Sequence, residues 1–124
     1  IHAAFAAQCG QQLQYRAVLV RPDGFEEAAR KFFDDGGAGL NVTVPFKQEA
    51  FAFADRLNQH ARRAGAANIL TRCADGGIEG DNTDGIGLVR DMVANLGWAV
   101  QGLRVLVLGA GGAARCGAGL RCGG

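Results

Sequence analysis

The stretch NVTVPFK, at residues 41–47, carries three side chains that could bind a polar ligand. Its β-branched residues predict a strand, and Asn41 and Thr43, two residues apart, would project from the same face of that strand. Pro45 ends the strand, because proline has no backbone N–H to donate to a neighbouring strand. Lys47 then follows at the carboxyl end of the strand, where open α/β sheets bind ligands. The alternative is that Lys47 is an ordinary solvated lysine, as most lysines are.

A second polar cluster, GDNTDG, occupies residues 80–85. Asp81 and Asp84 both lie in it, and only one of them needs to face a site. A purely structural interpretation is a helix N-cap, in which Thr83 or Asp84 caps the helix that follows. A calcium loop is excluded, because the glycine required at its sixth position would put Gly80 where an acidic ligand is needed.

A glycine-rich loop, GAGGAA, follows the apolar run 103–108 and fits the pattern G-x-G-x-x-A. The first glycine of this pattern allows a tight turn, the second lets the backbone approach a pyrophosphate, and the last small residue lets helix and strand pack closely. The cofactor-binding candidates are Gly109, Ala110, Gly111, Gly112 and Ala113. The alternative is a turn that binds no ligand. The residue that separates NAD from NADP is expected about 20 residues further along, so the two cofactors are not distinguished.

The composition is typical of a globular protein and argues against several classes of partner. Hydrophobic residues make up 48% of the 124 residues, charged residues 20%, and the net charge is +1. This balance gives no reason to expect nucleic acid or an anionic membrane as a partner. No apolar run approaches the roughly 20 residues of a membrane span, and no signal peptide is visible.

Cysteine and histidine residues show no spacing typical of a metal site. The four cysteines are Cys9, Cys73, Cys116 and Cys122. They form no C-x-x-C motif, so we interpret them as reduced thiols of a cytosolic protein, with a zinc site or a disulfide framework as the less favoured alternative. His2 and His60 have no carboxylate or cysteine at motif spacing, and we assign a catalytic role to neither.

Strands and helices alternate along the chain, which indicates an α/β fold with a mostly parallel sheet. Strands are expected at residues 13–20, 39–44, 67–72, 78–79 and 103–108. Helices are expected at residues 1–8, 25–33, 48–58 and 84–96. The helix at 25–33 has an apolar face of alanines and phenylalanines. Asp23, before this helix, and Glu26, in its first turn, have the spacing of a capping box, with Asp23 as the N-cap.

Both ends of the chain predict an internal fragment. The first residues look like the middle of a helix, without an initiator Met. Residues 116–124 contain almost no helix formers, although a helix should follow the glycine-rich loop, and glycine costs about 1 kcal/mol at each helical position. We therefore expect a missing N-terminal segment and a truncated or frame-shifted C-terminal end.

Four motifs, NVTVPFK, AGAANIL, GDNTDGIGL and VLGAGGAAR, in this order and at this spacing, resemble the shikimate dehydrogenase family. The resemblance covers nearly the whole chain up to Arg115. It implies a parallel-sheet substrate-binding domain at residues 1–83 and the start of a Rossmann-type NADP-binding domain at residues 84–124. It also implies NADPH-dependent reduction of 3-dehydroshikimate to shikimate, on the way to chorismate and the aromatic amino acids.

The resemblance also implies roles for individual residues. Lys47 and Asp84 would be the catalytic pair. The substrate-binding residues would be Asn41, Thr43, Lys47, Asn68 and Asp84. Residues 109–113 would hold the cofactor pyrophosphate. Reduction of a ketone develops negative charge on its oxygen, which must also receive a proton, and a positioned ammonium group can supply both the opposite charge and the proton.

The sequence departs from the family pattern in several places. Family members carry a Ser-x-Ser pair, for the substrate carboxylate, in a segment that would precede Ile1. A threonine usually follows the asparagine that corresponds to Asn68, and here that residue is Ile69. The rest of the nucleotide domain, and a late helix that returns a glutamine to the substrate, would follow Gly124. We therefore expect the chain by itself to be inactive.

Two other functions stay open. One is a non-catalytic remnant that binds a shikimate-like ligand, and the other is a quinate/shikimate dehydrogenase that uses NAD. The expected partner is a small-molecule substrate, shikimate or 3-dehydroshikimate, with neither nucleic acid nor membrane, and a homodimer is left open. The expected location is the cytoplasm.

Overall fold

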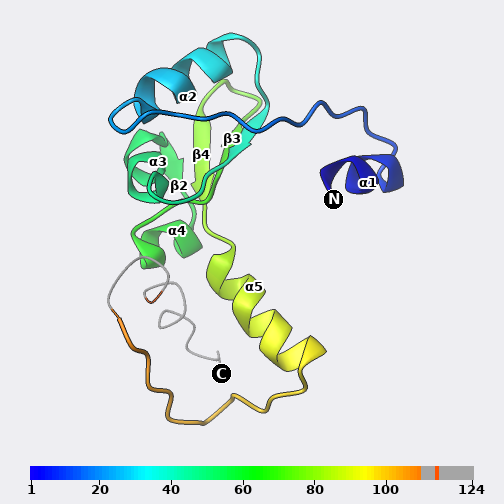
Figure 1. Ribbon diagram of the computed structural model, residues 1–124, viewed down its shortest axis with the longest axis vertical. Helices are drawn as coiled ribbons and strands as arrows, with labels where there is room; N and C mark the ends of the chain where they lie inside the picture. Colours follow the sequence, from blue (N-terminus) through cyan, green and yellow to red (C-terminus); the bar gives the residue numbers. More distant parts are fainter. Residues whose placement is uncertain (110–113, 115–124) are drawn as a thin grey trace.

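The computed structural model describes residues 1–109 and Ala114. Its helices are α1 (His2–Gln8), α2 (Phe25–Asp34), α3 (Lys47–Phe53), α4 (Gln59–Ala64) and α5 (Asp84–Arg90), which continues into the π-helical turn η1 (Asp91–Asn95). Its strands are β1 (Gly39–Asn41), β2 (Arg56–Leu57), β3 (Ile69–Arg72) and β4 (Ile78–Asp81). Helices α2 and α3 lie beside the sheet, α5 runs away from it, and α1 stands apart from the other helices (Figure 1).

The four strands form one mixed sheet in the order β1-β3-β4-β2. Strand β3 pairs antiparallel with β1 and with β4, whereas β2 pairs parallel with β4. The prediction of a mostly parallel sheet is therefore wrong. No helix separates β3 from β4, because a tight turn at residues 75–77 joins them, and Cys73 N–H donates to the Gly77 carbonyl at 2.8 Å. Two strands joined by so short a turn can only run antiparallel.

The core lies between the sheet and helices α2 and α3. Phe25, Ala29 and Phe33 are buried on α2, which confirms the predicted apolar face. The rings of Phe25 and Phe33 pack on Phe53 of α3, with centroids 6.3 and 6.2 Å away. Leu70 of β3 is fully buried beneath them. Burying one such side chain contributes about 1.5–3 kcal/mol, so this layer holds α3 against the sheet.

The start of α2 differs from the predicted capping box. Gly24 is the N-cap residue, and no side chain makes a hydrogen bond to the cap. Asp23 has a φ of 64°, a left-handed conformation that aspartate tolerates better than most residues. Asp23 therefore belongs to the turn before the helix, in which Gly24 N–H donates to the Arg21 carbonyl at 3.0 Å.

The helix expected at 48–58 is shorter than predicted and is followed by two further elements. Helix α3 ends at Phe53, and the backbone N–H groups of Asp55 and Asn58 donate to carbonyl groups of β4, which makes β2 an edge strand. The Asn58 side chain then caps α4 by accepting from Ala61 N–H at 2.9 Å. Neither β2 nor α4 is predicted from the sequence. A polar edge strand of two residues has no alternation to detect, and α4 has only six residues.

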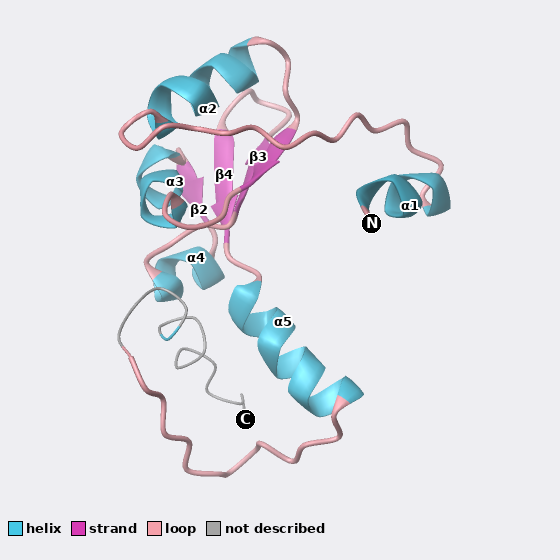
Figure 2. Cartoon of the chain, in the orientation of Figure 1, coloured by secondary structure: helices cyan, strands magenta, loops and turns pink. Residues whose placement is uncertain are grey.

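Two expected strands are not formed. Residues 13–20 and 103–108 pair with no strand in the part of the chain that the structure describes, and Figure 2 shows both as loops. Their apolar side chains are exposed, as for Leu19 and Leu108 at 101% and 88%. A strand needs a neighbour for its backbone N–H and C=O groups, and apolar residues alone do not supply one. The predicted Rossmann strand is therefore not seen.

Two other predictions are confirmed. Helices α5 and η1 account for the helix expected at 84–96, and Gly97 follows with a φ of 67°. The strands expected at 67–72 and 78–79 correspond to β3 and β4. Cys9 and Cys73 are free thiols, whereas Cys116 and Cys122 lie outside the described residues.

Across residues 1–109 and Ala114, no helix has the length and apolar character needed to cross a membrane.

An ion pair ties the β3–β4 turn to the edge strand. Arg56 Nη2 of β2 donates to Asp75 Oδ1 at 2.6 Å, and Gly77 N–H donates to the same oxygen at 3.1 Å. The hydrogen bond from Arg56, followed by the one from Gly77, lowers the pKa of Asp75 from 3.8 to about 2. The same contact raises the pKa of Arg56 further above its ordinary value.

Candidate functional site

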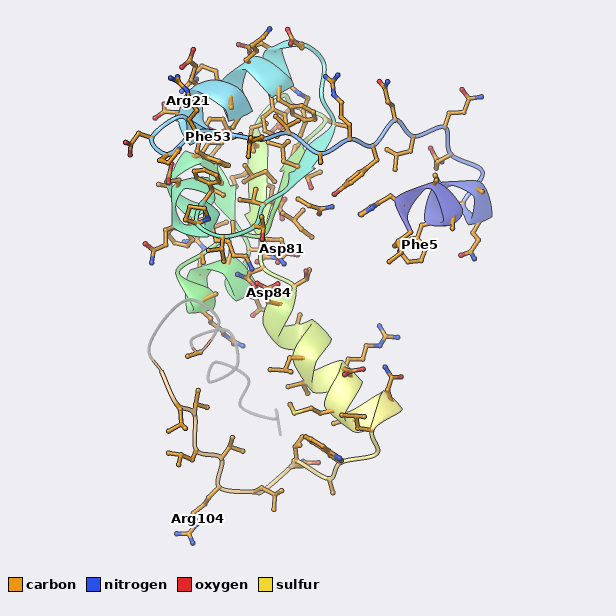
Figure 3. The ribbon with its side chains drawn as sticks, viewed as in Figure 1. Phe5, Arg21, Phe53, Asp81, Asp84 and Arg104 are labelled. Atoms are coloured by element: carbon orange, nitrogen blue, oxygen red, sulfur yellow. The ribbon has the colours of Figure 1, made fainter. Side chains whose placement is uncertain are left out.

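The candidate site lies at one end of the sheet, where three strand ends meet. Asn41 ends β1 and is in register with Ile69, the first residue of β3, which in turn is in register with Asp81 at the end of β4. Because β3 runs opposite to both neighbours, the chain enters β3 where it leaves β1 and β4. Figure 3 shows Asp81 and Asp84 at this end of the sheet, where α5 begins. Residues far apart in the sequence thus come together here.

Lys47 and Asp84 form the central contact of the site. Lys47 begins α3, Asp84 begins α5, and Lys47 Nζ donates to Asp84 Oδ2 at 2.6 Å. The two side chains are 27% and 36% exposed, so both are shielded from water on most of their surface while still accessible to a small ligand. A charge-assisted hydrogen bond of this length holds the ammonium group in a defined position.

Asn68 holds the other oxygen of the same carboxylate. Its Nδ2 donates to Asp84 Oδ1 at 2.8 Å and lies 3.1 Å from the Thr83 hydroxyl oxygen. Its own oxygen accepts from Thr83 N–H at 3.1 Å. Asp84 therefore has one oxygen on an ammonium and one on an amide, and its orientation is fixed from both sides.

Asn82 holds the loop that precedes α5, and it is not among the residues predicted from the sequence. It is 3% exposed, its Nδ2 donates to the Ala66 carbonyl at 2.9 Å, and its Oδ1 accepts from Asp84 N–H at 3.1 Å. An asparagine that bonds the backbone N–H two residues further along is typical of an Asx turn. The signal was present in the sequence, since Asn82 stands two residues before the first helical residue.

Asp81 has partners other than Lys47. Its Oδ1 accepts from Asn82 N–H at 2.5 Å and lies 3.5 Å from His60 Nδ1. Of the two aspartates in the cluster, the structure therefore brings only Asp84 to Lys47. His60 belongs to α4 and lies beside Asp81, which ends β4.

Asn41 and Thr43 lie at the same end of the sheet but outside this hydrogen-bond network. Both are exposed. The Asn41 amide contacts Tyr15 and His2, at 3.0 and 3.2 Å, and the Thr43 carbonyl accepts from Phe46 N–H at 3.0 Å. Exposed amide and hydroxyl groups can donate to and accept from the hydroxyl groups of a ligand. The structure thus joins Lys47, Asn68 and Asp84 directly. The other two candidates, which we call the rim of the site, lie outside this network at the same end of the sheet.

The nucleotide-binding candidates are described only in part. Gly109 has a φ of 117°, a conformation that side chains with a Cβ atom rarely adopt, and open space surrounds it. This backbone fits the first glycine of a pyrophosphate-binding turn. Ala110, Gly111, Gly112 and Ala113 lie outside the described residues.

Two other features lie away from this site. A pocket of about 240 Å³ is found at the opposite end of the sheet, next to Arg72, Gly76 and Ile78. Its lining is mixed, with two arginines, two aspartates and two phenylalanines, and it contains none of the candidate residues. Within the described residues, no group of three or more His, Cys, Asp or Glu side chains is placed to hold a metal ion.

Comparisons with known proteins identify a family. Residues 1–70 match the shikimate dehydrogenase substrate binding domain family. Shikimate dehydrogenase (NADP(+)) of Cellvibrio japonicus is 58% identical over 115 residues, which is 93% of this chain and 41% of the relative. The chain therefore spans about two fifths of the length of this curated relative.

Solved structures show the same fold. An Ael1 enzyme from Pseudomonas putida superposes with a TM-score of 0.86 at 47% identity, over 94% of this chain and 43% of that chain. Shikimate 5-dehydrogenase from Thermus thermophilus, in complex with NADP(H) and shikimate, gives a TM-score of 0.85 at 30% identity, over 98% of this chain and 45% of that chain. Since the family match alone covers more than half of the residues, the chain belongs to the shikimate dehydrogenase substrate-binding domain family.

Proposed function

We propose that this chain provides the substrate site and the proton donor of an NADP-dependent shikimate dehydrogenase, which reduces 3-dehydroshikimate to shikimate. The observation that carries the proposal is the Lys47–Asp84 contact of 2.6 Å, with Asn68 on the second carboxylate oxygen. A fixed ammonium, with amide and hydroxyl groups at the rim, suits a polyhydroxylated ring that carries a ketone.

Lys47 has two tasks in this reaction. Its positive charge stabilises the negative charge that develops on the carbonyl oxygen, and its ammonium group then gives that oxygen a proton. The carbonyl becomes a hydroxyl, and the neutral amine regains a proton from solvent. Asp84 keeps the ammonium in position and can accept a hydrogen bond from a neighbouring hydroxyl of the substrate, as Asn41, Thr43 and Asn68 also can.

NADPH, when bound, supplies the hydride that adds to the carbonyl carbon. Residues 109–113 would hold its pyrophosphate through backbone N–H groups, and the left-handed backbone of Gly109 supports this assignment. The second part of the proposal is a domain boundary between residues 83 and 84, with a Rossmann-type domain beginning at α5. It is supported by the direction of α5, which leaves the sheet at this point (Figure 1).

The proposal is tested with a chimeric enzyme. The matched 115-residue segment of the Cellvibrio japonicus shikimate dehydrogenase is replaced by that of this chain, and oxidation of shikimate with NADP+ is measured by absorbance. We expect turnover within about tenfold of the parent enzyme, because the substrate residues would be supplied intact. A chimera that is folded by circular dichroism and binds NADP+ but turns over no shikimate would contradict the proposal.

Titration of the isolated chain addresses the alternative of a non-catalytic remnant. Binding of shikimate by the chain, combined with an inactive chimera, would favour a binding role. Comparison of quinate with shikimate, and of NAD+ with NADP+, as substrates of the chimera would test the quinate/shikimate alternative. A cytoplasmic location stays a prediction, and a homodimer stays open.

A further inference from the structure

Two side chains from the N-terminal part of the chain hold the exposed carboxamide of Asn41. Its Nδ2 lies 3.0 Å from the Tyr15 hydroxyl oxygen and 3.2 Å from His2 Nε2. The two rings are stacked, with centroids 3.7 Å apart and an interplanar angle of 7°. Helix α1, the extended segment after it and strand β1 therefore meet at this one amide group.

The chemistry of the three groups restricts how the amide can be used. A carboxamide has two N–H donors and one acceptor oxygen. In the hydrogen-bond network one N–H donates to the Tyr15 hydroxyl, and the other points to His2 Nε2, which accepts when the imidazole is neutral and carries its proton on Nδ1. Both donors of Asn41 are then used within the protein, and Oδ1 is left to accept from the hydroxyl of a ligand.

We propose that His2 and Tyr15 are positioning residues, which hold the Asn41 carboxamide with its oxygen directed toward a substrate hydroxyl. The inference rests on the proposed function, since it assigns the orientation of one substrate-binding residue. It is independent of the Lys47–Asp84 contact, because none of the three residues takes part in that network.

The benefit of such an arrangement is lower entropy loss on binding. Asn41 is exposed and lies at the end of a strand, so without partners its side chain would rotate among several conformers. A ligand would then have to immobilise it. Ordering one flexible side chain weakens binding by about threefold to tenfold, and a side chain held in advance avoids that loss.

A double-mutant cycle on the full chain tests the inference. Tyr15→Phe keeps the ring and its stacking on His2 and removes only the hydroxyl. We expect it to weaken shikimate binding by about threefold to tenfold when Asn41 is present, and to have no effect in an Asn41→Ala background, because the two groups act as a unit. Equal losses in both backgrounds, or no loss in either, would overturn the inference. Leu13→Ala, an exposed change in the same segment, serves as the matched control and should leave affinity unchanged.

NMR of the ligand-free chain separates this inference from the proposed function. In the wild type we expect a resolved pair of Asn41 side-chain amide signals, and in Tyr15→Phe and His2→Phe we expect them to shift and to approach the positions of a freely rotating asparagine. Signals that are unchanged in both variants would show that the rings do not hold the amide. A wild-type chain that binds no shikimate would instead contradict the proposed function, while these signals would still decide whether His2 and Tyr15 hold Asn41.

Discussion

At the scale of single residues, the chemistry is concentrated in one carboxylate with two different partners. Asp84 binds an ammonium through one oxygen and an amide through the other. Its direction is therefore set before any ligand arrives. Such pre-orientation matters for the proposed reaction, because an ammonium group displaced by even about 1 Å would lose much of its effect on the rate.

Lys47→Ala should lower turnover of the chimeric enzyme by about 10²- to 10⁴-fold, since it would remove the proposed proton donor. The affinity for shikimate should fall much less, because several other polar groups remain. Steady-state rates and a binding titration measure the two effects separately. Lys31→Ala, which removes an exposed lysine paired only with Asp35 on its own helix, is the matched control. Turnover that stays at the wild-type level in Lys47→Ala would remove Lys47 from the mechanism.

Asp84→Asn should reduce turnover to a comparable degree while leaving the fold intact. The amide is nearly the same size as the carboxylate, but it is neutral and offers only one acceptor oxygen, so it cannot serve Lys47 and Asn68 together. Circular dichroism checks the fold and absorbance at the cofactor band measures the rate. A wild-type rate in Asp84→Asn would leave this aspartate as the first residue of α5 and nothing more.

At the scale of the secondary-structure elements, β2 packs closely against β4 at Gly80, and an ion pair links β2 to the β3–β4 turn. Gly80 of β4 lies where Leu57, Ala54 and Ala67 approach, and a Cβ atom there would lie 2.9 Å from Leu57 Cδ2. The other glycine of interest, Gly87 in α5, has open space around it. These two positions therefore respond in opposite ways to the same change.

Gly80→Ala should destabilise the chain by about 1–3 kcal/mol, because the added methyl group would displace the Leu57 side chain and would also lie 3.0 Å from Ala54 Cβ, which cannot move without its backbone. Gly87→Ala should stabilise it by about 0.4–1 kcal/mol, since alanine is the better helix former. Urea unfolding followed by circular dichroism gives both values. A Gly80→Ala chain as stable as the wild type would show that the sheet accommodates the added methyl group without cost.

The ion pair at the β3–β4 turn predicts a pH dependence. The pKa of Asp75 falls from 3.8 to about 2 on folding, so the unfolded chain binds the proton more readily than the folded chain. The stabilisation is present in full above about pH 4 and is lost as the pH falls toward about 2. The difference in unfolding free energy between the wild type and Asp75→Asn should therefore shrink over this range. A difference that stays constant from neutral pH down to the lower end of this range would contradict the assignment.

The sequence predicts some of these elements well and others badly, for physical reasons. The apolar face of α2 and the helix from Asp84 follow from local periodicity, which a single sequence contains. The direction of β3 relative to β4 depends on the short turn between them and is antiparallel, whereas the alternation of strands and helices predicts a mostly parallel sheet. Residues 13–20 look like a strand, yet strand formation requires a partner that local pattern cannot reveal. Likewise, NVTVPFK and GDNTDG marked Lys47 and Asp84, whereas the contact of His2 and Tyr15 with Asn41 depends on tertiary packing.

At the scale of the whole molecule, the described residues divide into a packed unit and exposed segments. The buried cluster around Leu70 joins the sheet to α2 and α3. By contrast, Phe5 of α1, Trp98 after η1 and Leu106 in the following segment are 58%, 57% and 84% exposed (Figure 3 labels Phe5 on its helix). The Lys47–Asp84 contact lies on the packed unit, so its geometry rests on the part of the chain that has a buried core.

Binding of shikimate should stabilise that unit as a whole. A ligand that binds only the folded state adds about 2.7 kcal/mol to the free energy of unfolding at about 100 times its dissociation constant. The melting temperature of the chain, followed by circular dichroism, should therefore rise with shikimate concentration, and it should rise much less for Asn68→Ala. Equal rises in both chains would show that binding occurs elsewhere.

The antiparallel register of β3 gives the site a property that its individual contacts do not. Side chains of a strand alternate between the two faces of the sheet, so a slip of β3 by one residue would turn every one of them over. Asn68 would leave Asp84, and Lys47 would lose the carboxylate orientation that Asn68 maintains. A misaligned molecule should therefore bind no ligand at the proposed site, and the fraction of molecules that binds shikimate would equal the fraction whose strands are correctly aligned.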